Sequence, residues 1–315
     1  MNRRLFLGCL TGACLAETAT VPIIDTHIHL FDPTRPQGVP WPGKDDSILY
    51  QPALPGRFRK VVSGLGITGA IEVECSPWLD DNQWVLDVAA KDTFIVGTVG
   101  NLVPGATDFR KHLERFHRNP LFRGIRYGNL WGRNLGAELS KPAFVSGLKA
   151  LGEAGLVLDT ANPNPELLAD IVRLSDLVAN LRIVVNHLPR LTPPVERAAR
   201  HAYQLTLSEL GKRPQVYVKV SQVLRRVDGG VPEKPGFYRE TLDELWDLFG
   251  ENRLLFGSDW PNSDPWGPYA LVLKIVRGYF AGKGPAATQK FFWKNSATAY
   301  RWIKREAGQP DPRSV

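Results

Sequence analysis

Eight short apolar runs recur along the chain, each followed by polar or Gly/Pro residues and then by a stretch with helical spacing. Several runs are dense in Val, Ile and Leu, as strands buried on both faces should be. Alternation of this kind predicts a parallel sheet with crossover helices. The predicted strands cover residues 21–29, 69–75, 94–100, 122–127, 156–160, 182–187, 216–221 and 254–260.

Eight strand–helix units are the count of a (β/α)8 barrel, the TIM barrel. The predicted helices include residues 82–90, 109–116, 144–154, 165–179, 195–210 and 238–249, and 289–304 form the last one. The alternative is an open doubly wound sheet, which usually carries a Gly-rich phosphate-binding turn after its first strand. The sequence has no such motif. We therefore expect one barrel domain over residues 21–305 and a C-terminal tail over 306–315.

The first 20 residues have the pattern of a targeting segment. Arg3 and Arg4 precede an uncharged run over residues 5–16, which is typical of a twin-arginine export signal. That run is too short to span a bilayer, and no other segment is long and apolar enough to do so. We expect an exported, periplasmic protein without stable membrane insertion; the alternative is a cytoplasmic one.

The charge of the chain and its distribution indicate which kind of partner to expect. The formal net charge is +7, but the Lys and Arg residues are spread along the chain. A nucleic-acid surface usually shows a basic patch or stripe, so we expect no nucleic-acid partner. A modest positive excess suits an anionic small-molecule substrate.

Polar side chains stand at the ends of the apolar runs, where the catalytic groups of a barrel project. Burying such groups is unfavourable unless they pair, form hydrogen bonds or hold a metal. Their recurrence therefore predicts a functional site at the mouth of the barrel. They are His27, His29, Glu72, Glu74, Arg126, Asp159, His187, Lys219 and Asp259.

Three histidines and one aspartate of this set suit a metal ion. His27 and His29 are two residues apart on a strand, so both point the same way. His187 adds a third imidazole and Asp259 a carboxylate, which together make a reasonable ligand set for zinc or a similar divalent ion. Each residue alone also has a structural explanation, such as a hydrogen-bonded core histidine, but their combination favours a site.

The motifs IIDTHIHLFDP at 23–33, FRGIRYG at 122–128, NHLP at 186–189, VKVS at 218–221 and LLFGSDWPN at 254–262 resemble the amidohydrolase-2 family. Within it they are most similar to the lactonase branch of L-fuconolactonase-like and 2-pyrone-4,6-dicarboxylate lactonase-like proteins. The resemblance runs from about residue 21 to 302. It implies a (β/α)8 barrel that opens a lactone or decarboxylates an aromatic acid, with site residues His27, His29, His187 and Asp259.

One departure from the wider superfamily concerns the number of metals. Many two-metal members use a carboxylated lysine and a further histidine on the strand after the one with the third ligand. That strand here carries Lys219 and Ser221 and no histidine. We therefore expect either one divalent ion, most naturally zinc, or a metal-free site, as in some lactonases of this branch.

The expected reaction is hydrolysis of a sugar-derived or dicarboxylate lactone by activated water. Asp259 is the candidate general base, and the histidines polarise the carbonyl directly or through one metal. His187 and Lys219 are further catalytic candidates. Arg126 suits a substrate carboxylate or hydroxyl, unless it pairs with a neighbouring acid. The alternatives are metal-dependent non-oxidative decarboxylation of an aromatic or unsaturated acid, other ester or amide hydrolysis, and a non-catalytic binding barrel.

Aromatic rings suggest how the substrate is held. Trp41, Trp78, Trp131, Trp260 and Trp266 all follow predicted strand ends. Flat apolar faces beside polar groups suit a sugar-derived lactone or an aromatic ring, unless these rings only pack the loops. We expect Trp78, Trp260 and Asp159 to contact the substrate together with Arg126. The long loop over residues 32–54, rich in Pro and Gly, is the candidate lid.

Overall fold

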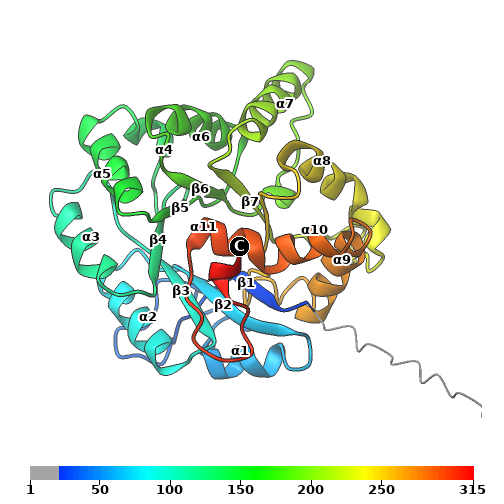
Figure 1. The fold of residues 1–315 in the computed structure, drawn as a ribbon, viewed down its shortest axis with the longest axis horizontal. Coiled ribbons are helices and arrows are strands. Elements are labelled where there is room, and N and C mark those ends of the chain that lie inside the picture. The colour runs from blue at the N-terminus through cyan, green and yellow to red at the C-terminus, as the bar shows by residue number, and fades with distance from the viewer. Residues whose placement is uncertain (1–20) are drawn as a thin grey trace, which may run out of the picture.

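The computed structural model describes residues 21–315, so the predicted export signal lies outside the described residues and remains a prediction. Eight parallel strands form one sheet whose spatial order, β1 to β8, is their order in the chain (Figure 1). Every predicted strand is confirmed, and so is the TIM barrel. The strands are β1 (Ile23–Ile28), β2 (Ile67–Val73), β3 (Ile95–Gly100), β4 (Phe122–Arg126), β5 (Val157–Asp159), β6 (Arg182–Val185), β7 (Val216–Val220) and β8 (Leu254–Phe256).

Most of the helices surround the ring of strands on its outside, whereas α11 (Asn295–Tyr300) lies across one end of it (Figure 1). The others are α1 (Pro55–Val61), α2 (Leu79–Lys91), α3 (Phe109–His117), α4 (Leu135–Glu138), α5 (Pro142–Glu153), α6 (Pro165–Leu177), α7 (Arg197–Gly211), α8 (Arg239–Phe249), α9 (Tyr269–Ala281) and α10 (Pro285–Gln289). Within residues 21–315 none of these helices is long and apolar enough to cross a membrane.

The strands are buried on both faces because alternate residues pack in different layers. Ile24 and Val96 belong to the cluster that includes residues of the C-terminal segment, whereas Ile23 and Ile95 belong to the cluster that includes the outer helices. All four side chains are fully buried. Continuous apolar runs are therefore what this fold requires of its strands.

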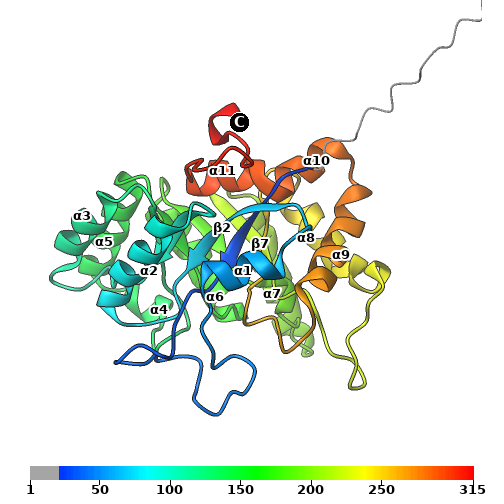
Figure 2. The same cartoon turned by 90° about the horizontal axis from the view of Figure 1, so that it is seen from below.

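The last helix is shorter and less regular than predicted. After α10 a π-helical turn (Lys290–Lys294) leads into α11, which ends because Arg301 takes a left-handed backbone conformation, with φ of 53°. The helix lies across one end of the barrel, and the long loop over residues 32–54 lies at the opposite end (Figure 2). Residues beyond α11 pack onto the body: Gln309 is buried and donates a hydrogen bond to the carbonyl of Thr93.

The ring closes between β1 and β8 over a short stretch. The amide of His29 donates to the carbonyl of Trp260, and the amide of Asp259 donates to the carbonyl of His27, both over 2.8 Å. The buried carboxylate of Asp25 reinforces this seam because it accepts hydrogen bonds from the amides of His27 (3.0 Å) and Ser258 (2.9 Å). The seam therefore places the ends of two strands side by side.

Replacing Asp25 by alanine is expected to destabilise the fold. The change leaves two buried amide groups without an acceptor, and each such group costs roughly 1–3 kcal/mol. We predict that Asp25→Ala lowers the free energy of unfolding in urea by about 3 kcal/mol. The control Asp45→Ala removes an exposed carboxylate of the long loop. Equal stability of the two variants would show that Asp25 does not secure the seam.

Candidate active site

Four buried side chains converge at the end of the barrel beside the β1–β8 seam. The Oδ1 atom of Asp259 lies 3.1 Å from His29 Nε2, 3.3 Å from His27 Nε2 and 3.6 Å from His187 Nε2. The histidines come from the ends of β1 and β6, and the aspartate follows β8. The structure thus brings together all four residues expected from the sequence.

Three residues at this site adopt left-handed backbone conformations. The φ angles are 58° at His187, 65° at Asp259 and 49° at Gln222, each just beyond the end of a strand. Such angles are uncommon for residues other than glycine, and they cluster at functional sites. Here they turn the chain sharply at the end of three strands.

The electrostatic surroundings keep the imidazoles of His27 and His187 neutral. Burial, reinforced by the charge of Arg126, lowers the pKa of His187 to about 3. Burial and the charge of Lys219 likewise lower the pKa of His27 well below its usual value. The carbonyl of Val73 accepts a hydrogen bond from His29 Nδ1 over 2.7 Å, which orients this ring so that its Nε2 atom faces Asp259.

The same surroundings keep Asp259 ionised. Burial by itself raises the pKa of this carboxyl, but its surroundings, including hydrogen bonds with His29 and Gln222, outweigh it and leave the pKa below the ordinary value. An ionised Asp259 thus faces the neutral imidazoles of His27 and His187 at about neutral pH.

The donor set fits one divalent cation. His27, His29 and Asp259 each offer a ligand atom, and these atoms lie within 4.8 Å of one another. The buried Nε2 atom of His27 has no hydrogen-bond partner among residues 21–315. Lone pairs directed at a carboxylate oxygen repel it unless a proton or a cation lies between them, and imidazole and carboxylate are ordinary zinc ligands. His187 stands outside this three-residue group.

The second oxygen of Asp259 has partners that the sequence reasoning missed. Its Oδ2 atom accepts hydrogen bonds from Gln222 Nε2 (2.5 Å) and Asn262 Nδ2 (2.7 Å). The sequence carries a signal for each of these two residues. Asn262 belongs to the GSDWPN motif, and Gln222 directly follows a predicted strand. Neutral amides have many structural uses, and therefore neither residue drew attention.

A cavity of about 240 Å³ opens onto these groups. Arg126, expected to bind substrate, lines it and is anchored by donating hydrogen bonds to the carbonyls of Glu74 and Thr160. Trp41 brings the long 32–54 loop into the wall. The lining residues are His29, Trp41, Cys75, Arg126, Leu130, Trp131, Asn162, His187, Arg190, Gln222, Asp259 and Asn262.

The expected roles of Lys219 as a catalytic residue and Asp159 as a substrate ligand need correction. Both side chains are fully buried, form an ion pair of 2.6 Å with each other, and do not line the cavity. Tyr300 donates a hydrogen bond to the other oxygen of Asp159. Lys219 Nζ reaches only as far as His27 Nδ1, at 3.4 Å. The pair therefore lies beneath the site and supports it.

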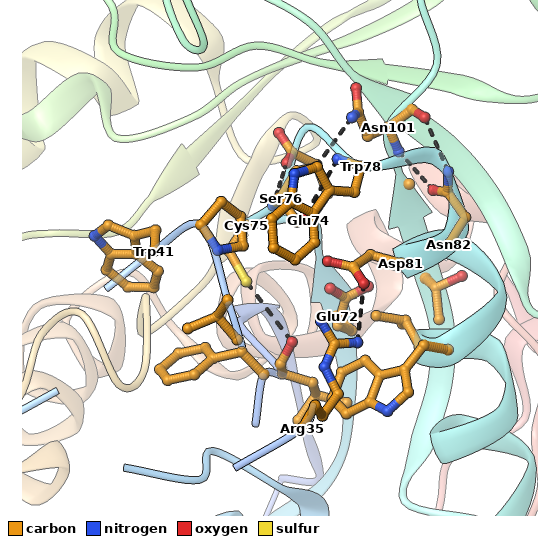
Figure 3. Close-up of a pocket in the computed structure, with 18 of the residues that line it drawn as sticks. Arg35, Trp41, Glu72, Glu74, Cys75, Ser76, Trp78, Asp81, Asn82 and Asn101 are labelled. Carbon is orange, nitrogen blue, oxygen red and sulfur yellow. Dashed lines mark hydrogen bonds and ion pairs between the residues drawn. The ribbon is translucent and has the colours of Figure 1, made fainter. Parts of the chain in front are cut away.

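Trp260 and Trp78, both expected to contact the substrate, do not line this cavity. Trp260 is fully buried, and its ring lies 5.0 Å from that of Phe58 in α1. Trp78 lines a second, smaller cavity of about 20 Å³, which has room for about one water molecule. Figure 3 shows this cavity, into whose walls Glu72 and Glu74 are built.

Zinc binding tests the predicted ligand set without reference to catalysis. Metal-free protein is expected to bind one equivalent of Zn²⁺, because one group of ligand atoms is preformed. We predict that His29→Ala weakens Zn²⁺ binding by roughly 100-fold or more in calorimetry, whereas His201→Ala, on the exposed face of α7, leaves it unchanged. Equal affinity of the two variants would contradict the assignment.

Comparison with known proteins places the fold and the site in context. The amidohydrolase family model matches residues 24–302. An L-fucono-1,5-lactonase of Burkholderia ambifaria is 27% identical over 299 residues, which cover 90% of this chain and 97% of that protein.

Solved structures share the fold. An amidohydrolase from Burkholderia multivorans with bound zinc superposes with a TM-score of 0.77, at 22% identity, over 89% of this chain and 99% of that one. A probable 2-pyrone-4,6-dicarboxylic acid hydrolase from Acinetobacter baumannii, with citric acid bound, gives 0.70 at 21% identity, over 89% and 99% of the two chains. Since the family model spans almost the whole described structure, the chain belongs to the amidohydrolase family.

Proposed function

We propose that this protein hydrolyses the ester bond of a lactone. The observation that carries the proposal is the convergence of one ionised carboxylate and three imidazoles beside an open cavity of a size suited to a single sugar-like ring. The L-fucono-1,5-lactonase relative and the 2-pyrone-4,6-dicarboxylic acid hydrolase neighbour support the same reaction class.

Lactone opening has three requirements that these residues meet. A water molecule must lose a proton, and the ionised Oδ1 of Asp259 is the base that takes it. Negative charge on the carbonyl oxygen must be stabilised, and Arg126, whose Nη2 atom lies 3.5 Å from His187 Nε2, supplies positive charge there. The leaving alkoxide must gain a proton, which Asp259 returns.

A bound divalent ion, which we propose to be zinc, would be held by His27, His29 and Asp259. Such an ion polarises a carbonyl and lowers the pKa of water. His27 would serve this role as a neutral ligand, because burial lowers its pKa and disfavours its charged form.

The cavity wall indicates the class of substrate. Trp41 and Trp131 offer flat apolar faces, whereas Arg126, Arg190 and Asn162 offer hydrogen-bond donors. This mixture suits a polyhydroxylated or acidic ring. L-Fucono-1,5-lactone, the substrate in the name of the curated relative, is therefore the first compound to test.

The proposal predicts enzymatic opening of sugar lactones, with L-fucono-1,5-lactone in a panel beside 2-pyrone-4,6-dicarboxylate and aromatic acids. Asp259→Asn, which removes the base, is expected to lower kcat by about 1,000-fold. The control Asp80→Asn changes an exposed carboxylate of α2 and should retain activity. Acid release is followed with a pH indicator, against the uncatalysed rate. Carbon dioxide from an aromatic acid, with no lactone opened, would instead show a decarboxylase.

The pH dependence follows from the shifted groups. Asp259 must be ionised, and its pKa lies below the ordinary carboxyl value; His187 must be neutral, and its pKa is about 3. Both conditions hold as pH falls from neutral, so kcat/KM should stay constant down to about pH 5. An acid limb at about pH 6.5, the ordinary histidine value, would contradict these assignments.

A further inference from the structure

The two oxygens of Asp259 have separate partners. Oδ1 faces the three imidazoles, whereas Oδ2 accepts hydrogen bonds from Gln222 and Asn262. The side chain of Asp259 is fully buried, so these contacts define its orientation. Two short donors on Oδ2 oppose rotation of the carboxylate and keep Oδ1 directed at the imidazoles.

The direction of the Gln222 amide is determined by Arg190. Arg190 Nη1 donates a hydrogen bond to Gln222 Oε1. A guanidinium has only donors, so the oxygen end of the amide must face it, and the nitrogen end is left for Asp259. Arg190 itself lies exposed at the mouth of the cavity. A chain of hydrogen bonds thus leads from the mouth to the candidate base.

We propose that Gln222, oriented by Arg190, is a positioning residue for the Asp259 carboxylate. The inference rests on the proposed function, in which Asp259 is the general base. Gln222 adopts a left-handed backbone conformation two residues beyond the end of β7, which is unfavourable for glutamine and is maintained by its surroundings. Its side chain donates to Asp259 and acts on the reaction through that carboxylate, without contact with the substrate.

The arrangement explains how one carboxylate serves both proton transfers. A proton leaves the attacking water for Oδ1 as the bond between the water oxygen and the carbonyl carbon forms. Because Gln222 and Asn262 both donate to Oδ2, that oxygen disfavours a proton, and the proton stays on Oδ1. When the bond from the carbonyl carbon to the ring oxygen breaks, Oδ1 returns this proton to the alkoxide.

An isosteric pair of variants separates donation from packing. Gln222→Met removes the donor, whereas Gln222→Glu keeps the shape and the contact with Arg190 but presents an acceptor to Asp259. We expect kcat to fall about 10-fold in Gln222→Met and about 100-fold in Gln222→Glu, with KM within about threefold of the wild type. The control Gln204→Met changes an exposed residue of α7. Wild-type kcat in Gln222→Glu would overturn the proposal.

A double-mutant cycle tests the part assigned to Arg190. If Arg190 acts on kcat through Gln222, then Arg190→Met lowers kcat by itself but adds nothing to Gln222→Met. The matched control is Arg118→Met, which removes an exposed guanidinium just after α3. Additive losses of kcat in the double variant would overturn the link between the two residues.

A crystal structure of Gln222→Glu gives a readout that does not depend on turnover. We expect Asp259 to rotate, so that its Oδ1 no longer lies 3.1 Å from His29 Nε2. If wild-type protein opens no lactone, the proposed function fails, yet this structure still tests the positioning of Asp259. An unmoved carboxylate in a folded Gln222→Glu protein would overturn the inference.

Discussion

The seam between β1 and β8 is the constraint on which the site depends. Two backbone hydrogen bonds join His27 to Asp259 and His29 to Trp260 across it, so the residues that close the barrel are the residues that carry the chemistry or adjoin it. The carboxylate of Asp25 accepts a hydrogen bond from one amide on each side of this seam, those of His27 and Ser258. The distance of Asp259 from the two histidines of β1 is therefore a property of the fold and requires no adaptable loop.

Burial then determines which chemistry this geometry performs. The imidazoles of His27 and His187, which are buried close to Lys219 and Arg126, are neutral, and the carboxylate of Asp259 remains ionised. Lys219 and Asp159 neutralise each other one layer below, so the barrel interior holds an ion pair without exposing it to the substrate. The hydrogen bonds to Oδ2 of Asp259 complete the arrangement by selecting the oxygen that reacts.

Much of this could be predicted from the sequence, because strands buried on both faces must be apolar and polar residues at their ends stand out. How deep a side chain lies in the barrel, and toward which side of the chain it points, could not be predicted in this way. Lys219 and Ser221 are two residues apart, so their side chains point the same way. Only Ser221 lies high enough in the barrel to form a hydrogen bond with His187. Trp260 follows Asp259 directly and packs on the other side of the strand, against Phe58. Gln222 and Asn262 were missed because an amide shows its role only through its neighbours.

If the convergent carboxylate and imidazoles are where a lactone is opened, a substrate that cannot react should be found there. A crystal structure of the Asp259→Asn protein soaked with L-fucono-1,5-lactone, in which the substrate survives, tests this. We expect an intact ring in the cavity that Trp41 and Trp131 line, with its carbonyl carbon about 3–3.5 Å from a water molecule that contacts residue 259. A lactone bound elsewhere, with the cavity beside the histidines filled only by solvent, would contradict it.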